Sequence, residues 1–240
     1  MTVVIVGNGP ITSGAESEIA AASLVVRFNE CRSFEHSRGR TDVVAVCNTG
    51  RPGRSMLSSS AWRDHPAVRA ASEIWCVRHP IKFAELRQHL ALSHPELGDF
   101  CDDYTGGFEA YATSAGKACR ILSRSTHDAV ELCLSKFAPP PYVVPSSGLI
   151  VIAEVIRRHP GRDVAIVGFS HEGWEWHPFS AERGLVDAWV AARRVRRGGC
   201  GSGTVAAPTP LTVSTGGGAA ADLQASVSPH ERPTGPQAAG

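Results

Sequence analysis

The sequence predicts an α/β protein, a single Rossmann-like domain in which helices flank a mostly parallel sheet. Short, continuously apolar runs of strand length recur along the chain, which is typical of strands covered on both faces. Segments with the spacing of amphipathic helices alternate with these runs, as parallel strands require. The chain has 240 residues, of which 42% are hydrophobic, and this suits one domain with a sizeable core.

The apolar runs that we predict to be strands are residues 3–6, 24–28, 43–46, 74–77 and 164–167. Residues 13–22 are rich in Ala and Glu and are predicted to form the crossover helix after the first strand. Apolar spacing predicts further helices over residues 81–92, 128–137, 147–158 and 178–197. The last of these helices is expected to end in four solvated cations: Arg193, Arg194, Arg196 and Arg197. Cations at the C-terminal end of a helix suit its dipole.

Two segments lack such a pattern. Residues 93–125 mix glycines and aromatic residues without a clean period, so we expect an irregular or helical segment that borders a cleft. Residues 198–240 contain no aromatic residue and are dominated by Gly, Ala, Ser, Thr and Pro. Such a segment buries too little apolar surface to offset its ordering entropy. The predicted organisation is therefore a folded domain over residues 1–197 and a disordered tail over 198–240.

The composition excludes several functions. With 24 basic and 23 acidic side chains, the formal net charge is +1, which disfavours a nucleic-acid partner. We find no signal peptide and no apolar run near the roughly 20 residues that span a bilayer, so we expect a cytoplasmic protein with reduced cysteines. No C-x-x-C pair occurs, and Cys47 and Cys76 are expected to be small core residues.

A glycine-containing loop follows the first predicted strand. Gly7, Asn8 and Gly9 stand between this strand and the next helix, where an α/β sheet can offer main-chain N–H groups to an anion. Thr12 occupies the position where the dinucleotide fingerprint needs glycine, so nicotinamide or flavin binding is not supported. A tight turn without a ligand is the alternative interpretation of this loop.

A second such corner opens the helix at residue 147. The hydroxyl groups of Ser146 and Ser147, next to Gly148, can either cap this helix or bind a phosphate or carboxylate. Ordinary capping remains the alternative. Asn29, at the end of the second strand, is expected to project into the crevice at the carboxyl edge of the sheet.

Residues 171–182 combine imidazoles, carboxylates and aromatic rings directly after an apolar run. His177 and Glu182 lie five positions apart; His94 and Asp99 have the same spacing, so the spacing alone is weak evidence. The context, after a buried strand and at a helix start, favours His177. The rival interpretation is that four residues bind a metal ion: His171, Glu172, Glu175 and His177. The H-E-x-x-H motif is absent, however, and we expect neither metal nor cofactor.

In their order along the chain, these residues resemble the four motifs of the sialyltransferases of glycosyltransferase family 29. The large motif is similar to residues 3–29 with an extension to Asn48, and the small motif to residues 145–150 closing on 167–169. The third motif is similar to residues 171–175, and the last to His177 and Glu182. The family's disulfide has no cysteine partners here, and its membrane anchor is missing. Short bacterial chains of this kind are sometimes labelled urease operon accessory proteins.

The resemblance implies a GT-A-like variant of the fold and an inverting transfer of a sialic-acid-like sugar. The implied partners are a cytidine monophosphate (CMP) sugar as donor and a glycan or other hydroxyl as acceptor. His177 would act as general base, with Glu182 completing its motif, and His171 with the main chain at Ser147 and Gly148 would stabilise the departing phosphate.

The resemblance also implies that Asn8 and Asn29 orient the nucleotide, while Trp174 or Trp176 walls the sugar. The sequence has no Asp-x-Asp pair, which predicts metal independence. The alternatives are a non-catalytic urease-operon accessory protein that binds a nucleotide or nickel, and a degenerate transferase that binds the donor without transfer. The sequence makes no prediction of the oligomeric state.

Overall fold

Helices enclose a parallel sheet in the computed structural model, which describes residues 1–35 and 39–199. This confirms the predicted α/β fold. Within the described residues the sheet has seven strands in the order β5-β4-β3-β2-β1-β6-β7, and every neighbouring pair is parallel. The strands are β1 Thr2–Val6, β2 Leu24–Phe28, β3 Val43–Val46, β4 Glu73–Cys76, β5 Ala118–Ile121, β6 Asp163–Val167 and β7 Arg196–Arg197.

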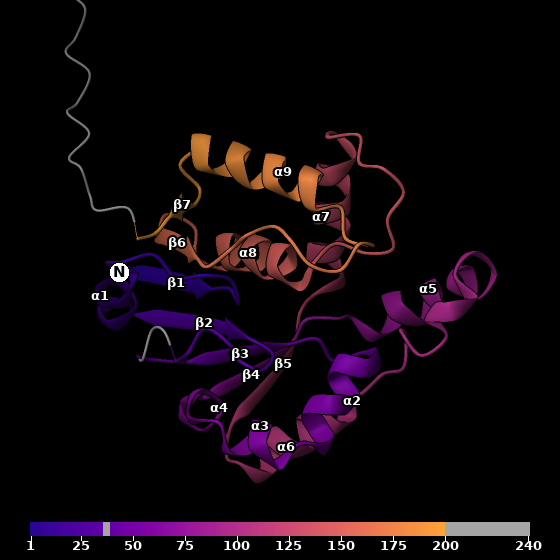
Figure 1. Ribbon diagram of the computed structural model, residues 1–240, viewed down its shortest axis with the longest axis horizontal. Helices are drawn as coiled ribbons and strands as arrows, with labels where there is room; N and C mark the ends of the chain where they lie inside the picture. Colours follow the sequence, from indigo (N-terminus) through magenta and orange to yellow (C-terminus); the bar gives the residue numbers. More distant parts are fainter. Residues whose placement is uncertain (36–38, 200–240) are drawn as a thin grey trace, which may run out of the picture. The chain divides into compact units, whose positions relative to one another are not determined.

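Two groups of helices cover the two faces of the sheet (Figure 1). One face carries α7, α8 and α9, and the other carries α1 to α4 and α6. The helices are α1 Ala15–Ala21, α2 Gly50–Ser58, α3 Ser60–Asp64, α4 Pro66–Ala70, α5 Pro80–Ser93, α6 Thr105–Ser114, α7 Arg124–Ser135, α8 Ser147–Arg158 and α9 Phe179–Ala191, with a short 3-10 turn at Pro95–Leu97.

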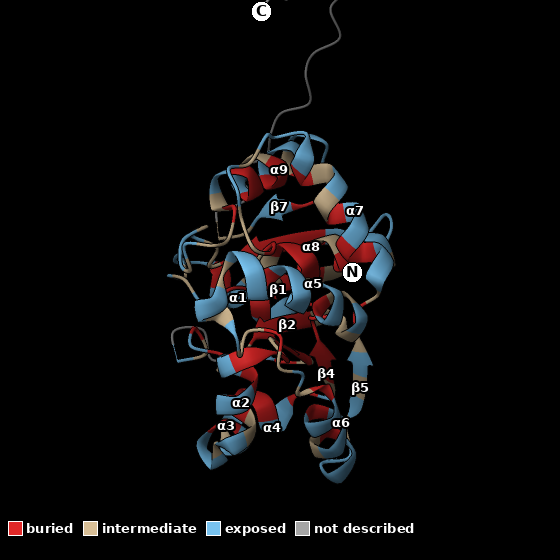
Figure 2. Ribbon diagram, turned by 90° about the vertical axis from the view of Figure 1, so that its right-hand side faces the viewer, coloured by how far each residue is buried: buried red, intermediate tan, exposed pale blue. Residues whose placement is uncertain are grey.

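Strand β1 shows why the apolar runs are continuous. Val3 and Ile5 pack into the core under α8, whereas Val4 and Val6 pack against α1 on the opposite face. Because successive side chains of a strand point to opposite faces, a strand covered on both sides needs apolar residues at every position. The buried residues accordingly line the sheet from both sides (Figure 2).

The prediction of a helix as far as residue 197 was wrong. Helix α9 ends at Ala191, and Arg193 adopts a positive φ of 55° that turns the chain. Arg196 and Arg197 then pair with β6 as strand β7. Their side chains bind carboxylates on the surface, Asp163 and Glu18 for Arg196 and Asp187 for Arg197, so these cations stabilise a sheet edge instead of a helix end.

The unpatterned segment 93–125 contains the 3-10 turn, helix α6 and strand β5. Strand β5 has no apolar run because it lies at the edge of the sheet, where its residues are exposed or half-buried in alternation. Helices α2, α3 and α4 were not predicted either. They are short, and α3 and α4 depend on caps supplied by Ser59 and His65.

The structure describes the first two residues of the predicted tail, Gly198 and Gly199. The Gly198 N–H donates to the Ile166 carbonyl at 2.9 Å, and the Gly199 N–H donates to the Glu18 carboxylate at 3.1 Å. Residues 200–240, most of the predicted tail, lie outside the described residues. In the described part, no helix has both the length and the apolar character that crossing a membrane requires.

Candidate active site

A cavity of about 430 Å³ opens at the carboxyl edge of the sheet. It is lined by residues that follow β1, β2, β3, β4 and β6 and by the start of α8. Strand β1 has β2 on one side and β6 on the other, and this change of direction creates the crevice where parallel sheets bind ligands. Every residue predicted for the site lines this cavity: Gly7, Asn8, Gly9, Asn29, Ser146, Ser147, Gly148, His171, His177 and Glu182.

The loop after β1 packs tightly on the loop after β6. The N–H of Gly7 donates to the Val167 carbonyl at 2.8 Å, and that of Gly9 to the Gly168 carbonyl at 2.9 Å. A Cβ atom on either glycine would lie less than 3.0 Å from the Gly168 carbonyl oxygen. Glycine is therefore required here by contact between two loops. The expected helix start is not adjacent, because α1 begins only at Ala15.

Asn8 and Asn29, which follow strands β1 and β2, line the cavity with their amide groups. The Asn8 Oδ1 accepts from the Arg32 N–H at 3.2 Å, and the Asn29 Oδ1 accepts from the Cys47 N–H at 2.8 Å. Asn29 also adopts a left-handed φ of 51°, which Asn tolerates better than most residues. With both oxygens occupied by the protein, each side chain keeps its NH₂ group as a donor for a ligand.

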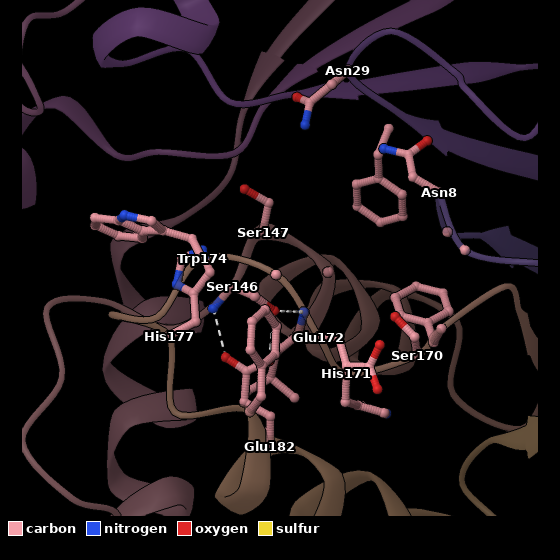
Figure 3. Close-up of a pocket in the computed structure, with 18 of the residues that line it drawn as sticks. Asn8, Asn29, Ser146, Ser147, Ser170, His171, Glu172, Trp174, His177 and Glu182 are labelled. Atoms are coloured by element: carbon pink, nitrogen blue, oxygen red, sulfur yellow. Dashed lines mark hydrogen bonds between the residues drawn. The ribbon is translucent and has the colours of Figure 1, made fainter.

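The start of α8 forms another wall of the cavity. Ser146 caps the helix through a 3.2 Å bond from the Leu149 N–H to its Oγ. Its own N–H and hydroxyl both donate to the carboxylate of Glu182, at 2.6 Å each (Figure 3). The N–H groups of Ser147 and Gly148 belong to the first helical turn and have no intrahelical acceptor, so they remain donors at the positive end of the helix dipole.

Glu182 holds α9 against α8. Its side chain is 1% exposed and both oxygens bind Ser146. Burial raises its pKa, although the hydrogen bonds from Ser146 and the charge of Arg78 act in the opposite direction. The carboxylate therefore fixes the position of Ser146 at the helix start.

His177 lies with one ring nitrogen fixed by the protein. Its Nδ1 is 2.8 Å from the Val144 carbonyl oxygen, which requires the proton on Nδ1 and leaves Nε2 as an acceptor. Burial, then the charge of Arg78, lowers the pKa of His177 to about 4. The imidazole is consequently neutral near pH 7 and able to take a proton at Nε2.

His171 reaches the cavity from the loop after β6. Its backbone has a positive φ of 53°, and its Nε2 is buried without a hydrogen-bond partner in the part of the chain that the structure describes. Burial lowers its pKa, and the charges of Arg197 and Arg183 lower it further. A buried ring nitrogen without a partner is costly.

The two candidate tryptophans differ in position. Trp174 lines the cavity and packs edge-on against His177, with ring centroids 5.0 Å apart, while Phe100 stacks on it at 5.1 Å. Trp176 is not among the lining residues and packs on His94 instead. No residue of segment 93–125 lines this cavity, so the expectation that the segment borders the cleft was wrong.

Cys47 and Arg78 are among the lining residues that the sequence analysis missed. Cys47 was expected in the core, but it is half-buried and lines the cavity because β3 ends at Val46; Cys76 is buried as predicted. Arg78 follows β4 and also lines the cavity. The rule that the carboxyl ends of parallel strands meet at one edge could have found both. Across the described residues, no group of three or more His, Cys, Asp or Glu could hold a metal ion.

The fold and the cavity define an α/β protein whose candidate site lies at the switch point of a parallel sheet. The chain belongs to the family of the urease operon 23 kDa accessory protein of Rhizobium meliloti (strain 1021). The two are 52% identical over 197 residues, which cover 81% of this chain and 91% of that protein. No protein-family model matches the chain.

Similar solved structures include three sialyltransferase structures, each covering 82% of this chain. CstII from Campylobacter jejuni, in complex with the substrate analogue cytidine monophosphate, is 12% identical with 77% of that chain covered and a TM-score of 0.46. A mammalian sialyltransferase is 15% identical with 68% covered and a TM-score of 0.43. CST-II with a trisaccharide acceptor and CMP is 10% identical with 80% covered and a TM-score of 0.48.

Proposed function

We propose that this chain is a glycosyltransferase of the sialyltransferase type, which transfers a sialic-acid-like sugar from a CMP-sugar to an acceptor hydroxyl. One observation carries the proposal. Residues 7–29, 146–148 and 171–182, chosen for their resemblance to sialyltransferase motifs, line a single cavity although the first segment lies more than a hundred positions from the other two. In this cavity a neutral imidazole keeps one nitrogen without a hydrogen bond to the described residues. A cavity of this size suits a small organic ligand.

The nucleotide half of the donor is proposed to bind between the asparagines and α8. The amide NH₂ groups of Asn8 and Asn29 can donate to ribose or base oxygens. The free N–H groups of Ser147 and Gly148 point from a twelve-residue helix whose N-terminus favours a phosphate. Asn8 and Asn29 lie on the opposite side of the site from His177 and Glu182 (Figure 3), which leaves the space between them for the donor.

The proposed reaction is a direct displacement with inversion. The His177 Nε2 takes the proton of the acceptor hydroxyl while that oxygen attacks the anomeric carbon. The bond from this carbon to the phosphate oxygen breaks, and CMP leaves with the electron pair. The hydrogen bond from Nδ1 to Val144 fixes the tautomer and stabilises the imidazolium that forms.

His171 and the start of α8 are proposed to stabilise the negative charge on the departing phosphate. The buried Nε2 of His171 lacks a partner in the described structure, and in the neutral tautomer that carries its proton on Nε2 the ring can donate to a phosphate oxygen. Glu182 is proposed to act as a positioning residue, because its bonds to Ser146 set the direction of the helix start. Trp174 is proposed to wall the sugar next to His177.

Release of CMP from labelled CMP-sialic acid tests the proposal. We expect the purified full-length protein to release CMP in the presence of EDTA, since a monophosphate leaving group carries little charge. We expect His177→Ala to lower the rate by a factor on the order of 10² to 10⁴, the usual contribution of a well-placed general base.

The matched control is His94→Ala. His94 has the same spacing to an acid, Asp99, but it does not line the cavity, so this variant should keep the wild-type rate. If His177→Ala keeps the wild-type rate as well, His177 is not the base. If the wild-type protein neither binds CMP nor releases it, the transferase proposal fails.

A second candidate function is a non-catalytic accessory role beside urease, favoured by the name of the Rhizobium meliloti relative. This role requires binding of a nucleotide or of nickel, the latter through His171 and His177. Calorimetry with nickel and with CMP separates the candidates. Nickel binding that is lost in the His171→Ala variant, without CMP binding, would support the accessory role and contradict the transferase.

A further inference from the structure

Arg78 is a buried cation without a carboxylate partner in the described structure. Its side chain is 2% exposed, and the loop that holds it is fixed by Asn48, which accepts from the Arg78 N–H at 2.7 Å and donates to its carbonyl at 2.9 Å. Its guanidinium lies 5.3 Å from the centre of the Phe83 ring. This environment fixes the position of the cation without neutralising it.

The guanidinium is incompletely bonded. Nη1 donates to the Pro145 carbonyl at 2.9 Å, while Nε is buried with no partner among the described residues. A buried arginine is ordinarily paired, because removing a cation from water is costly. A guanidinium has five N–H donors, and the hydrogen bond to Pro145 uses one of them, so donors of this cavity-lining residue remain for a ligand.

The carboxylates that line the cavity do not supply that group. Glu182 has both oxygens bound to Ser146, and no salt bridge joins Glu172 to Arg78 in the described chain. Arg78 and Arg32 are the cations among the lining residues, and Arg32 lies at the exposed rim with 71% of its side chain accessible. The charge of Arg78 also acts on Glu182, but no carboxylate among the described residues forms a salt bridge with the guanidinium, so an anionic group of a ligand can bind it directly.

The position of Arg78 indicates which anionic group it receives. Its charge acts directly on His177, and the base must lie next to the anomeric carbon. In a sialic-acid-like sugar a carboxylate is bonded to that carbon. A planar guanidinium matches a carboxylate in two parallel hydrogen bonds, whereas the start of α8 already offers N–H groups to the phosphate.

We propose that Arg78 binds the carboxylate of the donor sugar and thereby restricts the site to keto-acid sugars. The proposal rests on the proposed function and adds the residue that selects the sugar class. Arg78 touches the substrate without taking part in the transfer of the proton.

Binding measurements on two ligands test this role. We compare CMP with a CMP-sialic acid analogue whose transfer is blocked by fluorine next to the anomeric carbon. Arg78→Gln should leave the Kd for CMP within about threefold of the wild-type value. It should weaken binding of the analogue by about 10- to 100-fold, the range expected when charge-assisted hydrogen bonds are lost. Arg78→Lys, which keeps the charge, should recover part of the affinity.

The control is Lys82→Gln, which removes one positive charge nearby on α5 from a residue that does not line the main cavity. It should bind both ligands as the wild type does. Melting curves of all variants report whether the fold is retained.

A ligand-side experiment keeps the test independent of folding. The wild-type protein should bind the methyl ester of the analogue as weakly as Arg78→Gln binds the acid, and Arg78→Gln should not distinguish ester from acid. Equal losses for CMP and the analogue, or full affinity for the ester, would overturn the role of Arg78 alone. A wild-type protein that binds neither ligand would overturn the proposed function as well.

Discussion

His177 is a neutral imidazole in the wall of a cavity that is also lined by the buried cation Arg78. Burial and the charge of Arg78 both disfavour the protonated ring, while the Val144 carbonyl favours it less strongly. The residue was identified from its sequence context, but its tautomer was not. Only the 2.8 Å contact of Nδ1 with Val144 assigns Nε2 as the nitrogen that can accept a proton.

The lowered pKa of His177 predicts the pH dependence of the reaction. Because the pKa is about 4 in the folded protein, the base form persists well below the usual value of 6.5 for histidine. We expect kcat/KM for CMP-sugar consumption to stay constant from neutral pH down to about pH 5 and to fall only below it. The pH profile of kcat/KM reports the pKa values of the free enzyme.

An acid limb centred near pH 6.5 would contradict this expectation, because a solvent-exposed histidine would then limit the reaction. The control is the His94→Ala variant, whose profile should coincide with that of the wild type since His94 lies outside the cavity.

At the scale of elements, the two loops after β1 and β6 fix the floor of the site by direct backbone contact. Their strands pair in register over residues 2–6 and 163–167, so the loops leave the sheet side by side. The positive φ of 69° at Gly168 turns its carbonyl toward Gly7 and Gly9. A side chain at these positions would separate the loops.

Gly7→Ala tests the contact between the loops. Its Cβ would lie less than 3.0 Å from a backbone oxygen that cannot turn away, so we expect the free energy of unfolding to fall by about 2 kcal/mol, within the range for overpacked sites. We also expect CMP binding to weaken, because Asn8 would move with the loop. Urea unfolding and calorimetry measure the two effects.

The matched control is Gly106→Ala in α6, where a Cβ meets no atom within 4 Å. Alanine stabilises helices relative to glycine, so this variant should be slightly more stable than the wild type and bind CMP equally. A Gly7→Ala protein with unchanged stability would show that the loops can separate without cost.

Buried and edge strands differed in how well the sequence predicted them. Strands β1, β2, β3, β4 and β6 were predicted within one residue of their observed ends, because each is covered on both faces and is therefore mostly apolar. Strands β5 and β7 were missed because edge strands keep exposed side chains. Their pairing depends on backbone hydrogen bonds, which leave no composition signal.

At the scale of the whole molecule, buried histidines make the folded state sensitive to acid. Burial lowers the pKa of His127 and of His177 to about 4. The unfolded chain therefore binds protons below about pH 6.5 while the folded chain does not, and the free energy of unfolding falls as the pH decreases from 6.5 to 4. Each histidine contributes up to about 3 kcal/mol to this loss.

Urea unfolding at pH 7 and pH 4.5 measures this sensitivity, and we expect the free energy of unfolding to be lower at pH 4.5. The raised pKa of Glu182 acts in the opposite direction, but a single carboxyl group does not cancel two histidines. His127→Gln, whose amide nitrogen can replace the contact of Nε2 with the Val77 carbonyl, should reduce the difference. Equal stability at both pH values would contradict the buried, neutral state of these rings.

The site residues also differ in how well the sequence predicted them. Residue types and their neighbours identified the two corner loops and the histidine segment, and the structure places all of them in one cavity. Arg78 carried no local signal beyond its place after an apolar run. Its importance arises from burial and from the absence of a carboxylate partner among the described residues, and both are properties of its surroundings.

The sequence by itself determined the class of the fold, the buried strands and the residues at the carboxyl edge, because hydrophobic burial and turn chemistry act over a few neighbouring positions. Only the tertiary structure decided the strand order, the tautomer of His177, the hydrogen bonds between Glu182 and Ser146, and the burial of Arg78 without a direct carboxylate partner among the described residues. These depend on groups that are distant in sequence and meet only when β6 joins β1, and local patterns contain no information about such meetings.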